Sequence, residues 1–140
     1  LVAIASGFST AAISAGEFGS AAEAKAMLEK AVSAVKANKS AALGQFAKGE
    51  GGFRDRDLYP FCGGPDGNFT AHPSLTGKSM KDLMSKANEP IGAKLYEAAK
   101  EGSIAEVPYM WPRPGTTEPV QKLSYVTKIG DQVCAVGYYK

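Results

Sequence analysis

Apolar and small side chains recur at three- and four-residue steps over residues 20–48, which is the spacing of one face of an α-helix. The positions on that face are Ala24, Met27, Leu28, Ala31, Val35, Ala42 and Phe46. Ser20 and Glu23 have the spacing of a capping box, and Gly49 follows as a C-terminal stop signal. The pattern predicts one amphipathic helix of about 28 residues, roughly 40 Å long at the usual helical rise.

From residue 58 onward the pattern changes to short apolar and aromatic runs separated by turn signals, which is typical of strands. The strands that we expect are 58–62, 68–72, 105–111, 122–128 and 133–139. Gly63–Gly67 contains a Pro-Asp-Gly turn signal between the first two strands. Gly130-Asp131 predicts a two-residue hairpin between the last two.

Two short helices are expected between the second and third strands. Ser79 and Asp82 resemble another capping box, which places one helix at 79–87. Pro90 suits the first turn of a second helix that ends at Glu101, before Gly102. With 140 residues there is room for one domain, which we place at 16–140. The order of elements predicts an α+β fold with a five-stranded antiparallel sheet, a long N-terminal helix and short helices between strands two and three.

Residues 1–15 carry no charge and end in small residues before Glu17. This run has the features of the apolar region and cleavage site of a secretory signal peptide, with removal after Ala15. The alternative is a flexible or weakly helical tail. The run is shorter than the roughly 20 residues of a spanning helix. We therefore expect a periplasmic or otherwise exported protein, anchored in a membrane only if residues upstream of Leu1 lengthen the apolar run.

Charge and residue counts exclude several classes of function. The net charge is +2, and no stripe of Lys and Arg runs along the chain, which argues against a nucleic-acid partner. One His and two separated Cys do not make a usual zinc set, and no Asp spacing matches a calcium loop. No phosphate-binding loop occurs either. The sequence therefore predicts no metal and no cofactor.

A series of short motifs runs through the chain from the end of the expected helix to the last strand. They are Leu58–Phe61, Asp66-Gly67, Ala71–Pro73, Gly77-Lys78, Val107–Pro112, Lys122–Val126 and Val136–Tyr138. In this order and spacing they resemble a Cache domain, specifically the single-Cache type with a PAS-like sheet, over about Ser20–Lys140. The resemblance implies a bacterial domain that senses small molecules outside the cytoplasmic membrane.

The resemblance also implies where a ligand would lie, between the curved sheet and the segment that joins strands two and three. Tyr109 and Trp111 share a face of the third strand and are the main candidates to line that pocket, because each combines apolar area with a hydrogen-bond donor. Lys122 is the candidate cation for a ligand carboxylate, and Arg113 could serve in its place, although an arginine in a Pro-flanked loop is more often solvated. His72 and Tyr125 are further candidates.

Each of these side chains also has a structural interpretation. Tyr109 and Trp111 could fill the core, Lys122 could face solvent, and His72 could order a loop through a backbone hydrogen bond. Tyr125 lies on the opposite face of its strand from Lys122, and the sequence does not say which face meets the pocket.

Cys62 and Cys134 lie in strands that the resemblance places side by side, so an exported protein could bridge them. The alternative is two buried thiols, since cysteine packs as a small hydrophobe. An enzyme built on a Cys nucleophile with His72 as its base is the weakest hypothesis, because strand-buried cysteines lack an oxyanion donor and an open approach. We expect no enzymatic activity.

The sequence thus predicts a module that binds and senses a small organic acid or amino acid and signals through a partner, such as a membrane receptor or kinase. The alternative is a structural or interaction module of a sensory complex that has no small-molecule ligand. A long helix that projects beyond the core could also pack on a second copy to form a homodimer.

Overall fold

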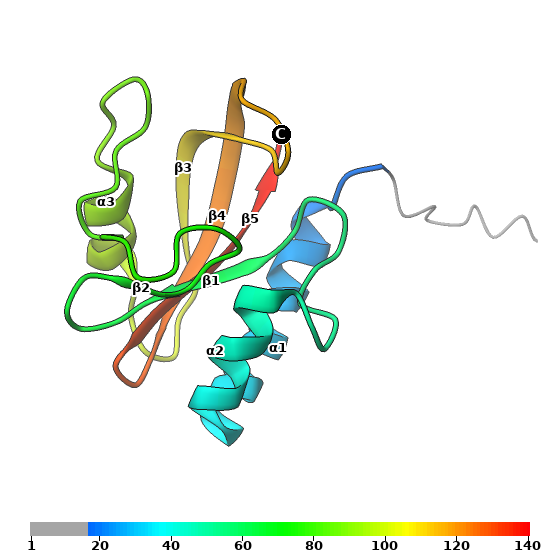
Figure 1. Ribbon diagram of the computed structural model, residues 1–140, viewed down its shortest axis with the longest axis vertical. Coiled ribbons are helices and arrows are strands. Elements are labelled where there is room, and N and C mark those ends of the chain that lie inside the picture. Colours follow the sequence, from blue (N-terminus) through cyan, green and yellow to red (C-terminus); the bar gives the residue numbers. More distant parts are fainter. Residues whose placement is uncertain (1–16) are drawn as a thin grey trace, which may run out of the picture.

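The computed structural model describes residues 17–140 (Figure 1), so the expected signal-peptide remnant at 1–15 lies outside the described residues. The elements in chain order are α1 (Ala21–Ala37), α2 (Lys39–Lys48), β1 (Pro60–Gly63), β2 (Phe69–Ala71), α3 (Ile91–Ala98), β3 (Ala105–Pro112), β4 (Pro119–Ile129) and β5 (Gln132–Tyr139). None of the helices in this part of the chain is long and apolar enough to cross a membrane.

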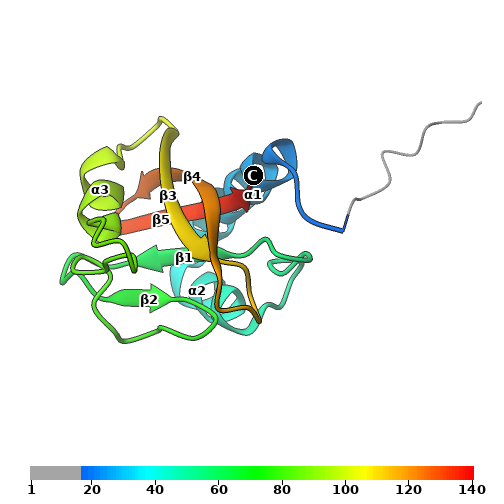
Figure 2. The same cartoon turned by 90° about the horizontal axis from the view of Figure 1, so that it is seen from above.

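The five strands form one antiparallel sheet in the order β2-β1-β5-β4-β3. Figures 1 and 2 show α1 and α2 on one face of the sheet and α3 near the other. Ile129 pairs with Gln132, so the expected two-residue hairpin at Gly130-Asp131 is present. The α+β class and the five-stranded antiparallel sheet are confirmed.

The single long helix predicted over residues 20–48 is wrong in one respect, because it is divided at Asn38. Asn38 has an extended backbone (φ −160°, ψ 95°), and its amide donates to the Ala34 carbonyl at the end of α1. Its side-chain oxygen accepts from the Ala41 amide and caps α2. Asparagine is a strong N-cap residue, so one side chain ends one helix and starts the next. The two helices pack against each other instead of projecting as one rod.

The helix predicted at 79–87 is also absent. Ser79 does bond to Asp82 as in a capping box, but the following amides do not continue into helical bonds. Met80 and Lys81 both donate their amides to the Gly67 carbonyl in the β1–β2 turn. Ser79 itself forms a bridge with Asn68. The amides of Met80 and Lys81 would be free in a helix as well, but Leu83 donates to the Met80 carbonyl in a single turn, and the Ser85 amide donates forward to the Glu89 carbonyl instead of back along a helix.

Each face of the sheet has its own apolar cluster. The first lies under α1 and α2, where Leu28 and Phe46 pack on Val136 and on the Cys62–Cys134 disulfide. The disulfide joins residues that are direct partners in the β1–β5 ladder. The second cluster lies on the α3 side, and its aromatic members are Tyr59, Phe61, Phe69 and Tyr109 with Trp111 at its border. The candidate site lies in this second layer.

Candidate ligand-binding site

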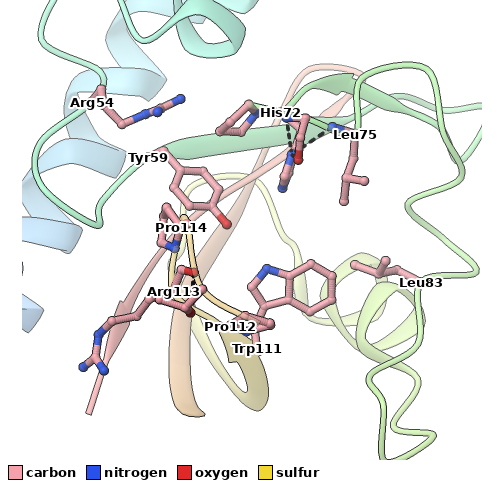
Figure 3. Close-up of a pocket in the computed structure, with 13 residues that line it drawn as sticks. Arg54, Tyr59, His72, Leu75, Leu83, Trp111, Pro112, Arg113 and Pro114 are labelled. Atoms are coloured by element: carbon pink, nitrogen blue, oxygen red, sulfur yellow. Dashed lines mark hydrogen bonds between the residues drawn. The ribbon is translucent and has the colours of Figure 1, made fainter. Parts of the chain in front are cut away.

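A cavity of about 320 Å³ opens on the α3 side of the sheet, at the edge of the second cluster (Figure 3). Three segments supply most of its wall: Tyr59 just before β1, residues 72–75 after β2, and residues 111–116 from the end of β3 into the β3–β4 loop. Leu83 and Arg54 complete the lining. In Figure 3 the side chains of Tyr59, His72 and Trp111 point toward one shared space.

A second and much smaller space of about 10 Å³ shares four lining residues with this cavity, namely Tyr59, His72, Leu83 and Trp111. Phe61, Phe69, Tyr109 and Lys122 enclose the rest of it. This volume is about that of one water position. The small space therefore adjoins the wide cavity at these four side chains; we call it the inner end of the site, and Lys122 borders it.

Lys122 is buried, with 2% of its surface exposed. Its ammonium donates to the Tyr59 hydroxyl at 3.2 Å. It also lies over the rings of Tyr59, Tyr139, Phe61 and Tyr109, at 4.7, 5.1, 5.4 and 5.8 Å from their centroids. Within residues 17–140 no carboxylate forms a salt bridge with it. Within the described residues, the ammonium is thus surrounded by aromatic rings and tyrosine hydroxyls instead of carboxylates.

The charge on Lys122 is preserved in this environment. Burial alone would lower the pKa of Lys122, but the oxygens of Tyr109, Tyr59 and Tyr139 outweigh that effect and raise its pKa above the ordinary value. The amine therefore stays protonated at neutral pH and offers a positive charge at the inner end of the cavity.

The sheet positions Lys122 through its register. Lys122 lies in β4 between Tyr109 of β3 and Tyr139 of β5, which are its direct partners on either side. Gly137 in β5 makes room for the lysine stem, because a Cβ at that position would collide with Lys122 Cε and Ser124 Oγ. The Tyr109 hydroxyl in turn bonds to Ser124 Oγ at 2.7 Å. The side chains around the ammonium are therefore fixed by neighbouring strands.

His72 is uncharged, and hydrogen bonds fix the orientation of its ring. Its Nδ1 accepts hydrogen bonds from the backbone amides of Ser74 (3.0 Å) and Leu75 (3.1 Å), which leaves the ring proton on Nε2. Burial, together with the positive charges of Lys122 and Arg54, lowers the pKa of His72 to about 3. The predicted role of His72 in ordering its loop is confirmed by these bonds. The same bonds leave Nε2 as a donor beside the cavity.

The structure brings together four of the five residues that the sequence singled out: Tyr109, Trp111, Lys122 and His72. It does not bring Tyr125 to them. Tyr125 lies on the helix-covered face of the sheet, where it stacks on Tyr138 with 6.1 Å between ring centroids.

Several residues of the site escaped sequence reasoning, and the two most important for its chemistry are Tyr59 and Arg54. Tyr59 is the hydrogen-bond partner of Lys122, and its only sequence signal was its place in the Leu58–Phe61 motif. Arg54 lies at the outer part of the cavity, with its guanidinium carbon 5.9 Å from the Tyr59 ring centroid. It comes from a glycine-rich, charged connection, a pattern that gave no reason to place it near the sheet.

The chemistry of the cavity favours an anion. None of the residues described along its wall is Asp or Glu, whereas Lys122 and Arg54 supply positive charge. Tyr59, His72 and Trp111 supply neutral donors. Within residues 17–140 no group of three or more His, Cys, Asp or Glu could hold a metal ion. Both cysteines are in the disulfide, so neither is a thiol nucleophile.

Several solved structures share this fold, and three of them are described here. A methyl-accepting chemotaxis protein from Vibrio parahaemolyticus is 27% identical, with a TM-score of 0.68 over 84% of this chain and 86% of that one. A periplasmic sensor domain of a chemotaxis protein is 21% identical, with a TM-score of 0.63 over 82% and 86%. A Cache chemosensory domain described for carboxylic acid recognition is 22% identical, with a TM-score of 0.57 over 82% and 84%.

The comparison with curated proteins finds no match. The family model described as "Cache domain" matches residues 25–139, which is nearly all of the described chain. The match includes every strand of the sheet and all the residues that enclose Lys122. The chain therefore belongs to the Cache domain family.

Proposed function

We propose that this protein is an extracytoplasmic sensor module that binds a small organic carboxylate in the cavity beside Lys122. The observation that carries the proposal is the buried ammonium of Lys122, which has no carboxylate partner within residues 17–140. Removing a charge from water costs several kcal/mol unless a partner compensates for it. A ligand carboxylate at the inner end of the cavity would be that partner.

The neutral donors around the cavity suit the same ligand. A carboxylate has two oxygens that accept hydrogen bonds, and Lys122 can satisfy only part of that capacity. The Tyr59 hydroxyl and the His72 Nε2 proton lie beside the same inner space. Leu75, Leu83 and Trp111 give the outer part an apolar wall against which a short carbon chain would pack.

The lining favours a simple carboxylate over an amino acid or an amine. A ligand ammonium group would need a carboxylate or several acceptors in the wall, and the residues that form this wall include no Asp or Glu. The positive charges of Lys122 and Arg54 would also repel it. We therefore place short organic acids before amino acids as the ligand class.

Relatives of the same fold support a location and a class of partner. One of them is named as a periplasmic sensor domain and another as a methyl-accepting chemotaxis protein. By likeness we propose that this chain works outside the cytoplasmic membrane and passes its signal to a membrane receptor or kinase. A homodimer through the N-terminal helices is the least supported part, because the division at Asn38 removes the single long helix. Light scattering of the purified protein tests it.

Thermal unfolding against a panel of short carboxylates, amino acids and amines tests the proposed ligand class. A ligand at 100 times its Kd stabilises the folded state by about 2.7 kcal/mol, which raises the Tm of a domain of this size by several degrees. We expect a carboxylate of the panel to give that increase and amines to give none. Whether the amino acids also raise the Tm decides between simple organic acids and amino acids as the ligand class.

Lys122→Met is the matched variant for this experiment, because it removes the charge and keeps an unbranched chain of similar length. We expect it to fold and to lose the carboxylate-induced rise in Tm. A rise of equal size in the variant would place the ligand elsewhere. If no compound of the panel raises the Tm of the wild-type protein, that result would contradict the ligand-binding proposal. It would favour an interaction module without a small-molecule ligand.

A further inference from the structure

Arg113 follows β3 in the β3–β4 loop, between Pro112 and Pro114, which contribute to the wall of the cavity. Arg113 itself lies along that wall, but its guanidinium does not point into the cavity. Figure 3 shows the guanidinium pointing away from Tyr59 and Trp111. The side chain is nevertheless largely buried, with 23% of its surface exposed. Because this guanidinium is mostly removed from water and points away from the cavity, other groups must interact with it.

Those groups belong to the chain segment that leads into α1. The Arg113 guanidinium lies over the Phe18 ring, 4.1 Å from its centroid, and its Nε lies 3.5 Å from Asp57 Oδ2. The other oxygen of Asp57 accepts the Gly19 amide at 2.7 Å in a buried hydrogen bond. A Cβ at Gly19 would collide with the Leu58 side chain, so the segment passes closely over the start of the sheet. Asp57 therefore links Arg113 to the start of α1.

The contact between Arg113 and Asp57 is an ion pair that does not have the geometry of a hydrogen bond. Arg113 Nε and Asp57 Oδ2 are both buried, and neither has a hydrogen-bond partner within residues 17–140. A charge-assisted hydrogen bond between such groups is about 2.7–2.9 Å long, shorter than the distance observed here. A small movement of the β3–β4 loop would close or open this contact. Its strength is thus sensitive to where the loop lies.

The loop is connected to Lys122 as well. The Tyr139 ring is contacted by both cations, with Lys122 Nζ 5.1 Å and the Arg113 guanidinium 5.2 Å from its centroid. The Tyr139 hydroxyl donates to the Pro112 carbonyl at 2.8 Å, at the base of the loop. An anion beside Lys122 would weaken the attraction of that ammonium for the Tyr139 ring. The ring, the loop and Arg113 would then readjust together.

We propose that Arg113 is the residue that couples the Lys122 end of the cavity to the segment entering α1, through Tyr139 on one side and through Asp57 and Phe18 on the other. Interfaces between packed groups shift between discrete arrangements and so pass small changes on. The coupling runs through contacts within the protein, so it can be tested without knowing the ligand. The test therefore uses no ligand, and a negative result would contradict the coupling without contradicting the ligand proposal.

The Gly19 amide is the reporter, observed by ¹H–¹⁵N NMR and hydrogen exchange in the full chain. Lys122→Met imitates neutralisation of the ammonium, and Tyr139→Phe keeps the ring but removes the bond to the loop. We expect each to move the Gly19 resonance and to change its exchange rate several-fold. In an Arg113→Ala background the same two substitutions should leave Gly19 unchanged. Equal changes with and without Arg113, or no change in either background, would overturn the proposal.

Arg54→Ala is the matched control, because Arg54 also lines the cavity and contacts the Tyr59 ring but has no contact with Asp57 or Phe18 among the interactions described. It should leave Gly19 unchanged. The reverse experiment uses Trp111, the only tryptophan, whose fluorescence reports on the cavity. Phe18→Ala should shift the Trp111 emission when Arg113 is present and not when it is Ala. An unchanged emission in both backgrounds counts against coupling in either direction.

Discussion

The two faces of the sheet are both buried, yet they hold different kinds of side chain. Under α1 and α2 the buried residues are aliphatic, aromatic or small, and a disulfide closes the layer. On the α3 side the sheet buries Lys122, His72 and Ser124 among its aromatic rings. The first arrangement stabilises the domain. The second keeps one ammonium and one neutral imidazole out of water, which costs stability, and under the proposed function it is where the anion binds.

The largest expected effect lies on the helix-covered face. Replacing both Cys62 and Cys134 by Ala removes a link across 72 residues of sequence. In the chain-entropy model a loop of that length is worth about 4 kcal/mol of unfolding free energy. We expect a loss of that order in urea unfolding monitored by circular dichroism. Wild-type protein reduced with dithiothreitol is the control and should unfold at a similarly low urea concentration.

Leu28→Ala tests packing on the same face. Leu28 is fully buried under the sheet, and removal of its side chain leaves a cavity beside Val136 and the disulfide. Substitutions of this kind cost about 3 kcal/mol of unfolding free energy. Urea unfolding measures the loss, and Ala26→Gly on the exposed side of α1 is a control with a smaller cost of about 1 kcal/mol. Carboxylate binding should persist at temperatures where the variant is folded.

His72 makes the α3 side sensitive to acid. The folded-state pKa of His72 is lowered to about 3 from an ordinary value of 6.5, so its effect on stability is complete above pH 6.5. As the pH falls below 6.5 the unfolded chain binds the proton first, and stability declines by up to about 1.4 kcal/mol per pH unit. We expect a loss of about 2 kcal/mol between pH 6.5 and 5, measured by urea unfolding.

His72→Asn is the control for this pH dependence. The asparagine carbonyl can take over the acceptor role of Nδ1 toward the Ser74 and Leu75 amides, but it does not titrate. Asp55 and Asp131 have lowered pKa values and reduce stability only as the pH falls below the ordinary aspartate value of 3.8, so they do not act in the pH 6.5–5 window. A variant that declines as steeply as wild type in that window would exclude His72 as the cause.

Lys122→Met should have the opposite sign from Leu28→Ala. Replacing a buried charge without a carboxylate partner by an apolar chain of similar size is often neutral or stabilising, and the tyrosines that raise the pKa of Lys122 offset part of that gain, so we expect a gain of at most about 1 kcal/mol. Urea unfolding and the carboxylate thermal shift are measured on the same sample. Higher stability with lost binding is the expected pair of results. A large loss of stability would mean that the ammonium is a structural element of the core.

The smallest expected effect is that of Tyr125→Phe. Tyr125 stacks on Tyr138 on the helix-covered face, away from Lys122. Removing its hydroxyl should leave the carboxylate thermal shift unchanged, whereas Tyr59→Phe removes the hydrogen-bond partner of Lys122 and should alter it. Equal effects of the two substitutions on the thermal shift would contradict the prediction that the ligand binds on the α3 side of the sheet.

Sequence signals predicted the structure correctly where the hydrogen bonds involved join residues that are close in the sequence. The Ser20–Glu23 capping box is present, with both reciprocal bonds. The Gly130-Asp131 hairpin has its expected register, and all five strands appear within a few residues of their expected bounds. Such features depend on residues at most a few positions apart, so the chain itself specifies them.

The sequence also determined that Lys122 and Tyr125 lie on opposite faces of one strand, because side chains alternate along β-structure. Only the tertiary structure decided which face meets the cavity, since that depends on where α1 and α2 pack. It likewise decided that residues 79–81 bond to the β1–β2 turn and that the Ser85 amide donates to Glu89, so that no helix forms over residues 79–87. The position of Tyr59 beside Lys122 joins residues 63 apart in sequence. Contacts of that range are selected by the packing of the whole domain, and no local pattern specifies them.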